Sequence, residues 1–176
     1  MVGIPGAGKT AFAERFSKTF QAPLINQAAI QKNLELSAEV STKVALLMLD
    51  ELLKTNRTLI YEGPTSTKVS RAAIIKHVSN AGYQPMIVWV QTESVEAKRR
   101  ATKKQSDNSQ LTSEEFDNAI KHFTPPSIQE KALVISGKHT YASQLKIVLK
   151  RLAGEGRPPI EPDQPRVRSS RNIILR

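Results

Sequence analysis

The sequence predicts an α/β protein, a three-layer sandwich in which helices cover both faces of a parallel sheet of about five strands. Two observations lead to this prediction. Short apolar runs alternate with stretches in which apolar residues recur at helical spacing, and such alternation is typical of right-handed parallel crossovers. The chain also opens on a glycine-rich loop, MVGIPGAGKT, directly ahead of a helical stretch, which is expected where a strand passes into a helix at the edge of a sheet.

The first half of the chain alternates between the two kinds of element. The predicted elements are the end of a strand at Val2, a helix over 11–20, a strand over 22–26, a helix over 39–54, a strand over 57–63 and a helix over 66–82. In the first helix, Phe12, Phe16 and Phe20 stand four apart and share one face. The helix over 66–82 begins on a serine cap and ends at Gly82.

The second half repeats the pattern. The predicted elements are a buried strand over 85–91, a very basic helix from Ser94 to about Gln105, a helix that starts near Thr112, a strand over 131–137 and a helix over 141–152. Thr112 with Glu115 three residues on is a capping-box start.

The first strand is unusually short in the sequence as given. Only Met1 and Val2 precede Gly3, whereas a mean strand has about 5 to 6 residues. We therefore expect that the chain as given lacks a few residues of its first and central strand. A wrongly assigned start, a fragment or a genuinely short strand would each give this pattern.

Composition sets limits on organisation and location. The 176 residues suffice for one domain with a real core, which we place at 1–153. No cysteine is present, so disulfides are excluded and a reducing compartment is favoured. The apolar runs are far shorter than the roughly 20 residues that span a bilayer, and no signal peptide is visible. These features predict a soluble, cytoplasmic protein without membrane contact.

The last 23 residues differ from the rest. The stretch 154–176 is rich in proline and arginine and has little apolar periodicity, which predicts a disordered basic tail. This tail could be an arm for nucleic acid or a partner protein, or a solvated tail without a dedicated partner. The net charge of +10 suits anionic ligands in general.

The opening loop fits the pattern G-x-x-x-x-G-K-[ST]. In this pattern the backbone N–H groups of the loop and the positive end of the following helix cradle phosphate oxygens. Lys9 would reach the β and γ phosphates of a nucleoside triphosphate, and Thr10 would bind Mg²⁺. The residues predicted to bind the nucleotide here are Gly3, Pro5, Gly6, Ala7, Gly8, Lys9, Thr10 and Ala11.

Four segments together resemble a known family of enzymes. They are VGIPGAGKT, the strand LIYEGPT followed by an arginine in SRAAIIKHVSNAGY, the basic segment VEAKRRATKK, and LTSEEFDNAIKHFTPPSIQEKALVISG. From Val2 to Leu152 the chain resembles the P-loop kinases grouped around polynucleotide 5′-hydroxyl kinase, zeta toxin and gluconate kinase. The resemblance implies a P-loop NTPase fold of kinase type with a helical lid at about 94–125, and ATP with Mg²⁺ as cofactors.

The resemblance also implies roles beyond the loop. Glu62 falls where these kinases place the acid at the end of the strand beside the phosphate loop, so it would act in catalysis and on Mg²⁺, where the family more often has aspartate. Arg71 matches an arginine that faces substrate or phosphate in relatives, although a solvated helix arginine is an equal alternative.

The basic segment of the lid is the second implied site. Family members close lid arginines over the triphosphate, where charge stabilisation is the main catalytic task. Arg99 and Arg100 are the strongest candidates because the guanidinium forms bidentate contacts, and Arg100 is predicted to be catalytic. A generic basic face or a nucleic-acid backbone site are the alternatives.

The chain departs from the family pattern at LINQAAIQKNL. Where family members have a catalytic aspartate and, three residues later, a substrate-binding arginine, this chain has Ala28 and Gln31. An alanine cannot accept a proton, so the usual general base is missing, while Gln31 stays the predicted substrate contact. Glu62 could act as the base instead.

Three functions follow from these observations. The first is an ATP-dependent kinase that phosphorylates a hydroxyl of a nucleic-acid end, a nucleotide or a small molecule. The second is a degenerate kinase that binds ATP, and hydrolyses it slowly, as a regulatory module. The third is a nucleic-acid-binding protein, which the scarcity of aromatic residues argues against. The sequence leaves the acceptor and the oligomeric state open.

Overall fold

The computed structural model of the protein describes residues 1–103 and 110–154. Its helices are α1 (Lys9–Phe20), α2 (Gln27–Asn33), α3 (Ala38–Leu53), α4 (Lys68–Asn80), α5 (Ser94–Thr102), α6 (Ser113–Lys121) and α7 (Tyr141–Gly154), with one 3₁₀ turn, η1 (Ile128–Glu130). Its strands are β1 (Leu24–Asn26), β2 (Ile60–Glu62), β3 (Val88–Gln91) and β4 (Leu133–Ser136). All of the predicted basic tail after Gly154 lies outside the described residues.

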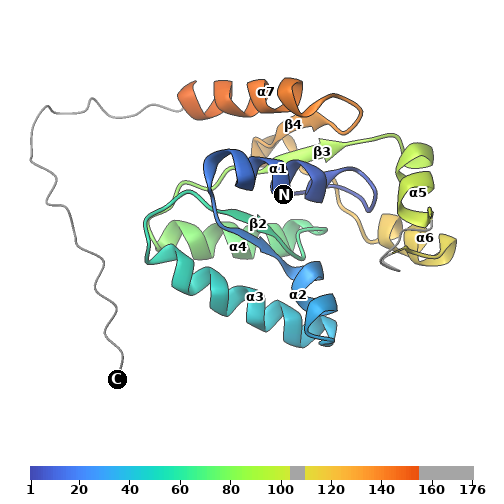
Figure 1. Ribbon diagram of the computed structural model, residues 1–176, viewed down its shortest axis with the longest axis horizontal. Coiled ribbons are helices and arrows are strands. Elements are labelled where there is room, and N and C mark those ends of the chain that lie inside the picture. The colour runs from blue at the N-terminus through green and yellow to red at the C-terminus, as the bar shows by residue number, and fades with distance from the viewer. Residues whose placement is uncertain (104–109, 155–176) are drawn as a thin grey trace, which may run out of the picture.

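The elements form three layers around parallel strands (Figure 1). On one face, Phe12 and Phe16 of α1 and Val148 of α7 pack against β3 and β4. On the other face, Leu49 of α3 and Val78 of α4 pack against β1 and β2. Burial of these apolar side chains is the main driving force for the fold. The arrangement of helices on both faces of the parallel strands confirms the predicted α/β sandwich.

Two parallel pairs make up the sheet, β1 with β2 and β3 with β4. Between the pairs lies Val2, which forms an isolated parallel bridge to Trp89 of β3, while the amino group of Met1 donates a 2.8 Å hydrogen bond to the carbonyl oxygen of Tyr61 in β2. Within the described residues, the sheet therefore has four strands instead of about five. The fifth, central position is held by only these first residues, too few to form a ladder of their own.

Several boundaries differ from the predictions for local reasons. The strands predicted over 57–63 and 85–91 are shorter, because a ladder extends only as far as a neighbouring strand pairs with it. The helix predicted over 66–82 starts after Thr67, which caps it together with Ser70, and not on the preceding serine. The capping box of Thr112 and Glu115 is confirmed. Helix α2 was not predicted, because its sequence lacks apolar periodicity.

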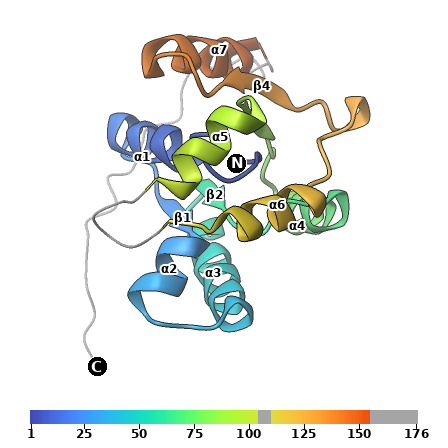
Figure 2. The ribbon, with the colours of Figure 1, turned by 90° about the vertical axis from the view of Figure 1, so that its right-hand side faces the viewer.

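The segment predicted to be a lid contains α5 and α6, which pack on each other at one end of the sheet (Figure 2). Phe116 of α6 is completely buried among Ala97 and Ala101 of α5, and Ile4 of the glycine-rich loop packs against this cluster. The lid therefore rests directly on the loop that precedes α1. Within the described part of the chain, no helix is long and apolar enough to cross a bilayer.

Candidate nucleotide site

The glycine-rich loop connects Val2 to the first residue of α1. Gly8 forms the N-cap of α1 with φ 104°, and no side chain caps the helix at this end. The first N–H groups of an α-helix have no partner within the helix. Here they are left available to an anion at the positive end of the helix dipole.

The centre of the loop, at Gly6, has no room for a residue larger than glycine. Its φ of 72° lies in the left-handed region, and a β-carbon on Gly6 would clash with the carbonyl oxygen of Ala97 in α5. Since only glycine adopts this backbone without strain, Gly6 serves both the curvature of the loop and its close contact with the lid.

The side chain of Lys9 folds back over the loop. Its Nζ donates a 3.1 Å hydrogen bond to the carbonyl oxygen of Ile4. Burial lowers the pKa of Lys9, and the nearby carboxylate of Glu62 opposes that effect. An ammonium held by a single backbone carbonyl can exchange this contact for a phosphate oxygen at little cost, because the new hydrogen bond is charge-assisted on both sides.

Glu62 and Thr10 meet beside the loop. The hydroxyl of Thr10 donates a 2.8 Å hydrogen bond to Oε1 of Glu62, and Nδ2 of Asn26 donates to Oε2 at 3.2 Å. The buried carboxylate at the end of β2 is thereby aimed at the start of α1. Hydroxyl and carboxylate oxygens are the ligands that Mg²⁺ takes, directly or through water, so these two residues fit a magnesium ion.

The end of β1 carries amides in place of acids. Oδ1 of Asn26 accepts a hydrogen bond from the N–H of Ala29 and caps α2. Ala28 is exposed in the first turn of α2, so no carboxylate stands at the position of the family aspartate. Gln31 accepts a 3.5 Å hydrogen bond from Gln27. Its role toward a substrate stays a prediction.

One carboxylate holds both lid arginines. Arg100 donates to Glu96 at 2.7 Å and to the carbonyl oxygen of Gly137 at 2.9 Å, and Arg99 donates twice to Glu96 at 2.8 Å. These hydrogen bonds lower the pKa of Glu96 to about 2. The contact with Gly137, just past β4, keeps Arg100 at the same edge of the sheet as the phosphate loop.

Arg71 occupies a different environment from the one expected for a substrate contact. The residue is 2% exposed, and its guanidinium forms a bidentate ion pair with Glu130 at 2.6 and 3.0 Å. It also donates to the carbonyl oxygens of Thr65 and Thr124. These contacts link α4 to the segment after the lid, which is a structural role. A role toward substrate has no support in them and stays a prediction.

Sequence reasoning missed three contributors to this region. Asn26 braces Glu62, Glu130 neutralises Arg71, and the hydroxyl of Thr92 donates to the carbonyl oxygen of Ala7 at 2.9 Å. Asn26 could have been identified from the sequence, because it is an amide at the end of a strand and can also cap a helix. Nothing in the sequence connects Thr92 with Ala7, because 85 positions separate them.

Comparison with known proteins places these features in a family. A family model described as an AAA domain matches residues 1–126. A search of curated proteins finds no match.

Solved structures share the fold. A gluconokinase from Sinorhizobium meliloti aligns with a TM-score of 0.64 at 12% identity over 86% of this chain and 89% of its own. Kti12 from Chaetomium thermophilum, solved with ADP-AlF3, aligns with a TM-score of 0.65 at 16% identity over 88% and 97%. Shikimate kinase from Aquifex aeolicus aligns with a TM-score of 0.55 at 18% identity over 87% and 94%. The chain therefore belongs to the AAA domain family and has the fold of the P-loop kinases.

Proposed function

We propose that the protein binds ATP with Mg²⁺ at the glycine-rich loop and transfers the γ-phosphate to a hydroxyl group. The observation that carries this proposal is the convergence of Lys9, Thr10 and Glu62 at the uncapped start of α1. Two structural neighbours were solved with nucleotides, ADP-AlF3 in Kti12 and dATP in a deoxyadenosine kinase. The fold they share with this chain supports the proposed nucleotide.

Each residue then has a task in phosphoryl transfer. The N–H groups of the loop and of α1 hold the phosphates, and Lys9 leaves the carbonyl of Ile4 to contact phosphate oxygens. Thr10 and Glu62 would hold Mg²⁺, and the ion would supply positive charge that offsets the charge of the phosphates. Arg100 stabilises the charge on the phosphoryl group that is transferred.

We also assign the role of general base, which accepts the proton of the acceptor hydroxyl, to Glu62. It is a carboxylate at the strand end beside the loop, and Ala28 cannot accept a proton. The acceptor is a hydroxyl of a nucleic-acid end, a nucleotide or a small molecule. The absence of cysteine and the use of ATP both suit a cytoplasmic location.

A second function is favoured by Ala28 itself. Without a base at that position, the protein would bind ATP and signal through the lid, with slow hydrolysis at most. Binding of nucleic acid through the lid is less well supported, because Asp117 pairs with Lys98 and Glu96 pairs with Arg99 and Arg100. Exposed pairs of this kind offer less free positive charge to a phosphate backbone.

Calorimetry of ATP binding in Mg²⁺ tests the proposal, with Lys9→Ala as the key variant and Lys18→Ala, exposed on the same helix, as its control. A charge-assisted hydrogen bond is worth about 1.5–3 kcal/mol, so Lys9→Ala should weaken binding about ten- to a hundredfold. Equal ATP affinities of the Lys9→Ala and Lys18→Ala proteins would contradict the proposed nucleotide site.

The same samples then decide between the two functions. ADP release is measured with and without a panel of oligonucleotide 5′ ends, nucleosides and small alcohols. Stimulation by one acceptor that disappears in Lys9→Ala supports the kinase. Binding of ATP without stimulation by any member of the panel supports the regulatory module.

A further inference from the structure

The two carboxylate oxygens of Glu96 on α5 have different sets of partners. Arg99 contacts both oxygens, with Nε on Oε2 and Nη2 on Oε1, each at 2.8 Å. Arg100 contacts Oε1 alone, through its Nε at 2.7 Å. A bidentate guanidinium fixes the plane of a carboxylate as well as its place. The two contacts of Arg99 therefore hold Glu96 in the orientation in which Oε1 reaches Arg100.

On its other side, Arg100 is tied to the edge of the phosphate loop. Its Nη1 donates a 2.9 Å hydrogen bond to the carbonyl oxygen of Gly137. Gly137 lies so close to the loop that a β-carbon on it would clash with the carbonyl oxygen of Ala7. A β-carbon on Gly8, the N-cap of α1, would stand 3.9 Å from the α-carbon of Gly137. A single residue therefore separates Arg100 from the place where the loop and α1 can hold an anion.

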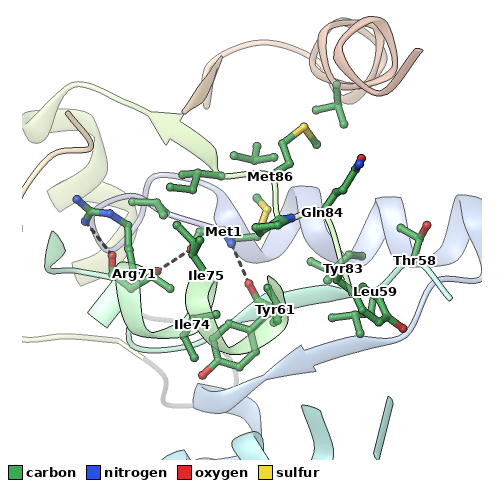
Figure 3. Close-up of a pocket in the computed structure, with 18 of the residues that line it drawn as sticks. Met1, Thr58, Leu59, Tyr61, Arg71, Ile74, Ile75, Tyr83, Gln84 and Met86 are labelled. Atoms are coloured by element: carbon green, nitrogen blue, oxygen red, sulfur yellow. Dashed lines mark hydrogen bonds between the residues drawn. The ribbon is translucent and has the colours of Figure 1, made fainter. Parts of the chain in front are cut away.

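The guanidinium of Arg100 also keeps one nitrogen free, since Nη2 has no hydrogen-bond partner among the described residues. Arg71 differs in this respect. It stands at one end of a pocket lined mainly by apolar side chains (Figure 3), and both of its terminal nitrogens donate to Glu130 or to backbone carbonyl oxygens. Arg99 differs as well, because its side chain is 65% exposed and its contacts are with Glu96 alone. Arg100 can thus offer an anion a donor whose direction is already fixed.

Charge alone would give Glu96 an unfavourable effect on a bound nucleotide. Its carboxylate repels phosphates and cancels the positive charge of one of the two guanidinium groups. Ion pairs at i,i+3 and i,i+4 on a helix surface also contribute little to stability. The effect of Glu96 that its contacts support is therefore on the direction of Arg100.

We propose that Glu96 is a positioning residue for Arg100. Oε1 of Glu96 holds Nε, the carbonyl of Gly137 holds Nη1, and the remaining nitrogen, Nη2, contacts the γ-phosphate of the bound nucleotide. The pair of Glu96 and Arg100 stays intact in the complex. An arginine held on two sides loses less freedom when it forms a third hydrogen bond, so it favours a triphosphate over a diphosphate. This inference rests on the proposed nucleotide site but not on phosphoryl transfer.

The preference for a triphosphate tests the proposal. Calorimetry in Mg²⁺ gives the affinities for the β,γ-imido analogue of ATP and for ADP, and their ratio is the preference. Arg100→Met should lower this ratio about tenfold or more, because a charge-assisted hydrogen bond is lost. Glu96→Met keeps the length of the side chain without its oxygens and should lower the ratio about threefold or more. Glu96→Gln keeps an oxygen for Nε and should lower it less than Glu96→Met does.

Glu114→Gln, which removes a carboxylate from the exposed surface of α6, is the matched control and should leave the ratio unchanged. An unchanged or higher ratio in both Glu96→Met and Glu96→Gln would overturn the proposal, because the loss of a repelling charge alone gives that result. An unchanged ratio in Arg100→Met would overturn it too.

Lys9→Ala separates these results from a failure of the nucleotide site. If Lys9→Ala weakens ATP binding while Glu96→Met keeps the full ratio, the nucleotide site stands and the positioning role is wrong. If Lys9→Ala binds ATP as tightly as Lys18→Ala does, both the nucleotide site and the positioning role are wrong.

Proton NMR of the unsubstituted protein gives a second test that does not depend on the folding of a variant. The Nε–H of Arg100 should exchange with water more slowly than that of Arg57, with and without the ATP analogue, because Glu96 accepts it in both states. Arg57 is an exposed reference that bonds through Nη2, and not through Nε, in the described part of the chain. Exchange of the Arg100 Nε–H as fast as that of Arg57 in the complex would overturn the proposal, since Arg100 would then have left Glu96.

Discussion

The hydroxyl of Thr10 donates a 2.8 Å hydrogen bond to the carboxylate of Glu62, although 52 positions separate the two residues in the chain. One follows the glycine-rich loop and the other ends β2. The fold brings them to the same edge of the sheet, which is where ligands bind in open α/β proteins.

Glu62→Gln keeps the size of the side chain and removes its charge. Because a carboxylate helps to hold Mg²⁺, we expect the Mg²⁺-dependent gain in ATP affinity to fall about tenfold or more. The measurement is calorimetry of ATP binding with and without Mg²⁺. Glu14→Gln, exposed on α1, serves as the control. A Glu62→Gln protein with the full Mg²⁺ effect would show that this carboxylate does not serve the metal.

Arg71→Met should destabilise the protein by about 3–5 kcal/mol, because it leaves Glu130 with an uncompensated charge in a largely buried site. Lys68→Met, exposed on the same helix, should change stability by less than about 0.5 kcal/mol. Urea unfolding measures both. Adding Glu130→Gln to Arg71→Met should restore part of the loss, and a double variant as unstable as the sum of the single ones would argue against the pairing.

Gly6→Ala tests the contact between the loop and the lid. Alanine at this φ costs about 1–2 kcal/mol, and its β-carbon would also clash with Ala97. Gly82→Ala is a matched control, since Gly82 has φ 83° with open space around its α-carbon. We expect Gly6→Ala to lower the melting temperature more than Gly82→Ala does, and to weaken ATP binding, which Gly82→Ala leaves intact. Equal decreases in melting temperature from the two substitutions would mean that the loop is not in close contact with the lid at Gly6.

The α-amino group of Met1 should make stability depend on pH. Burial lowers its pKa from 8.0 to about 6, with Glu62 raising it and Lys9 lowering it further. Between pH 6 and 8 the unfolded chain therefore binds more protons than the folded chain does, so the free energy of unfolding should rise with pH in this window. N-terminal acetylation removes the group, so urea unfolding of the acetylated protein should give a flatter profile. Identical slopes for the acetylated and the unmodified protein would contradict the assignment.

Local patterns in the sequence were sufficient for much of this molecule. Apolar spacing predicted the alternation of strands and helices, and glycines at fixed positions with Lys9 and Thr10 predicted the phosphate loop, because both depend on neighbours in the chain. The capping box at Thr112 is local in the same sense. Glu62 was identified through the resemblance to the P-loop kinases, which place an acid at the end of the strand beside the loop.

Features that depend on contacts between distant segments of the chain were visible only in the tertiary structure. The bracing of Glu62 by Asn26, the burial of Arg71 against Glu130 and the holding of Arg100 by Gly137 each join segments distant in the sequence. Strand lengths also depended on pairing, since β2 extends as far as its ladder with β1 and β3 as far as its ladder with β4. Sequence patterns specify which face a residue prefers, while the partner on that face is chosen by how the layers pack.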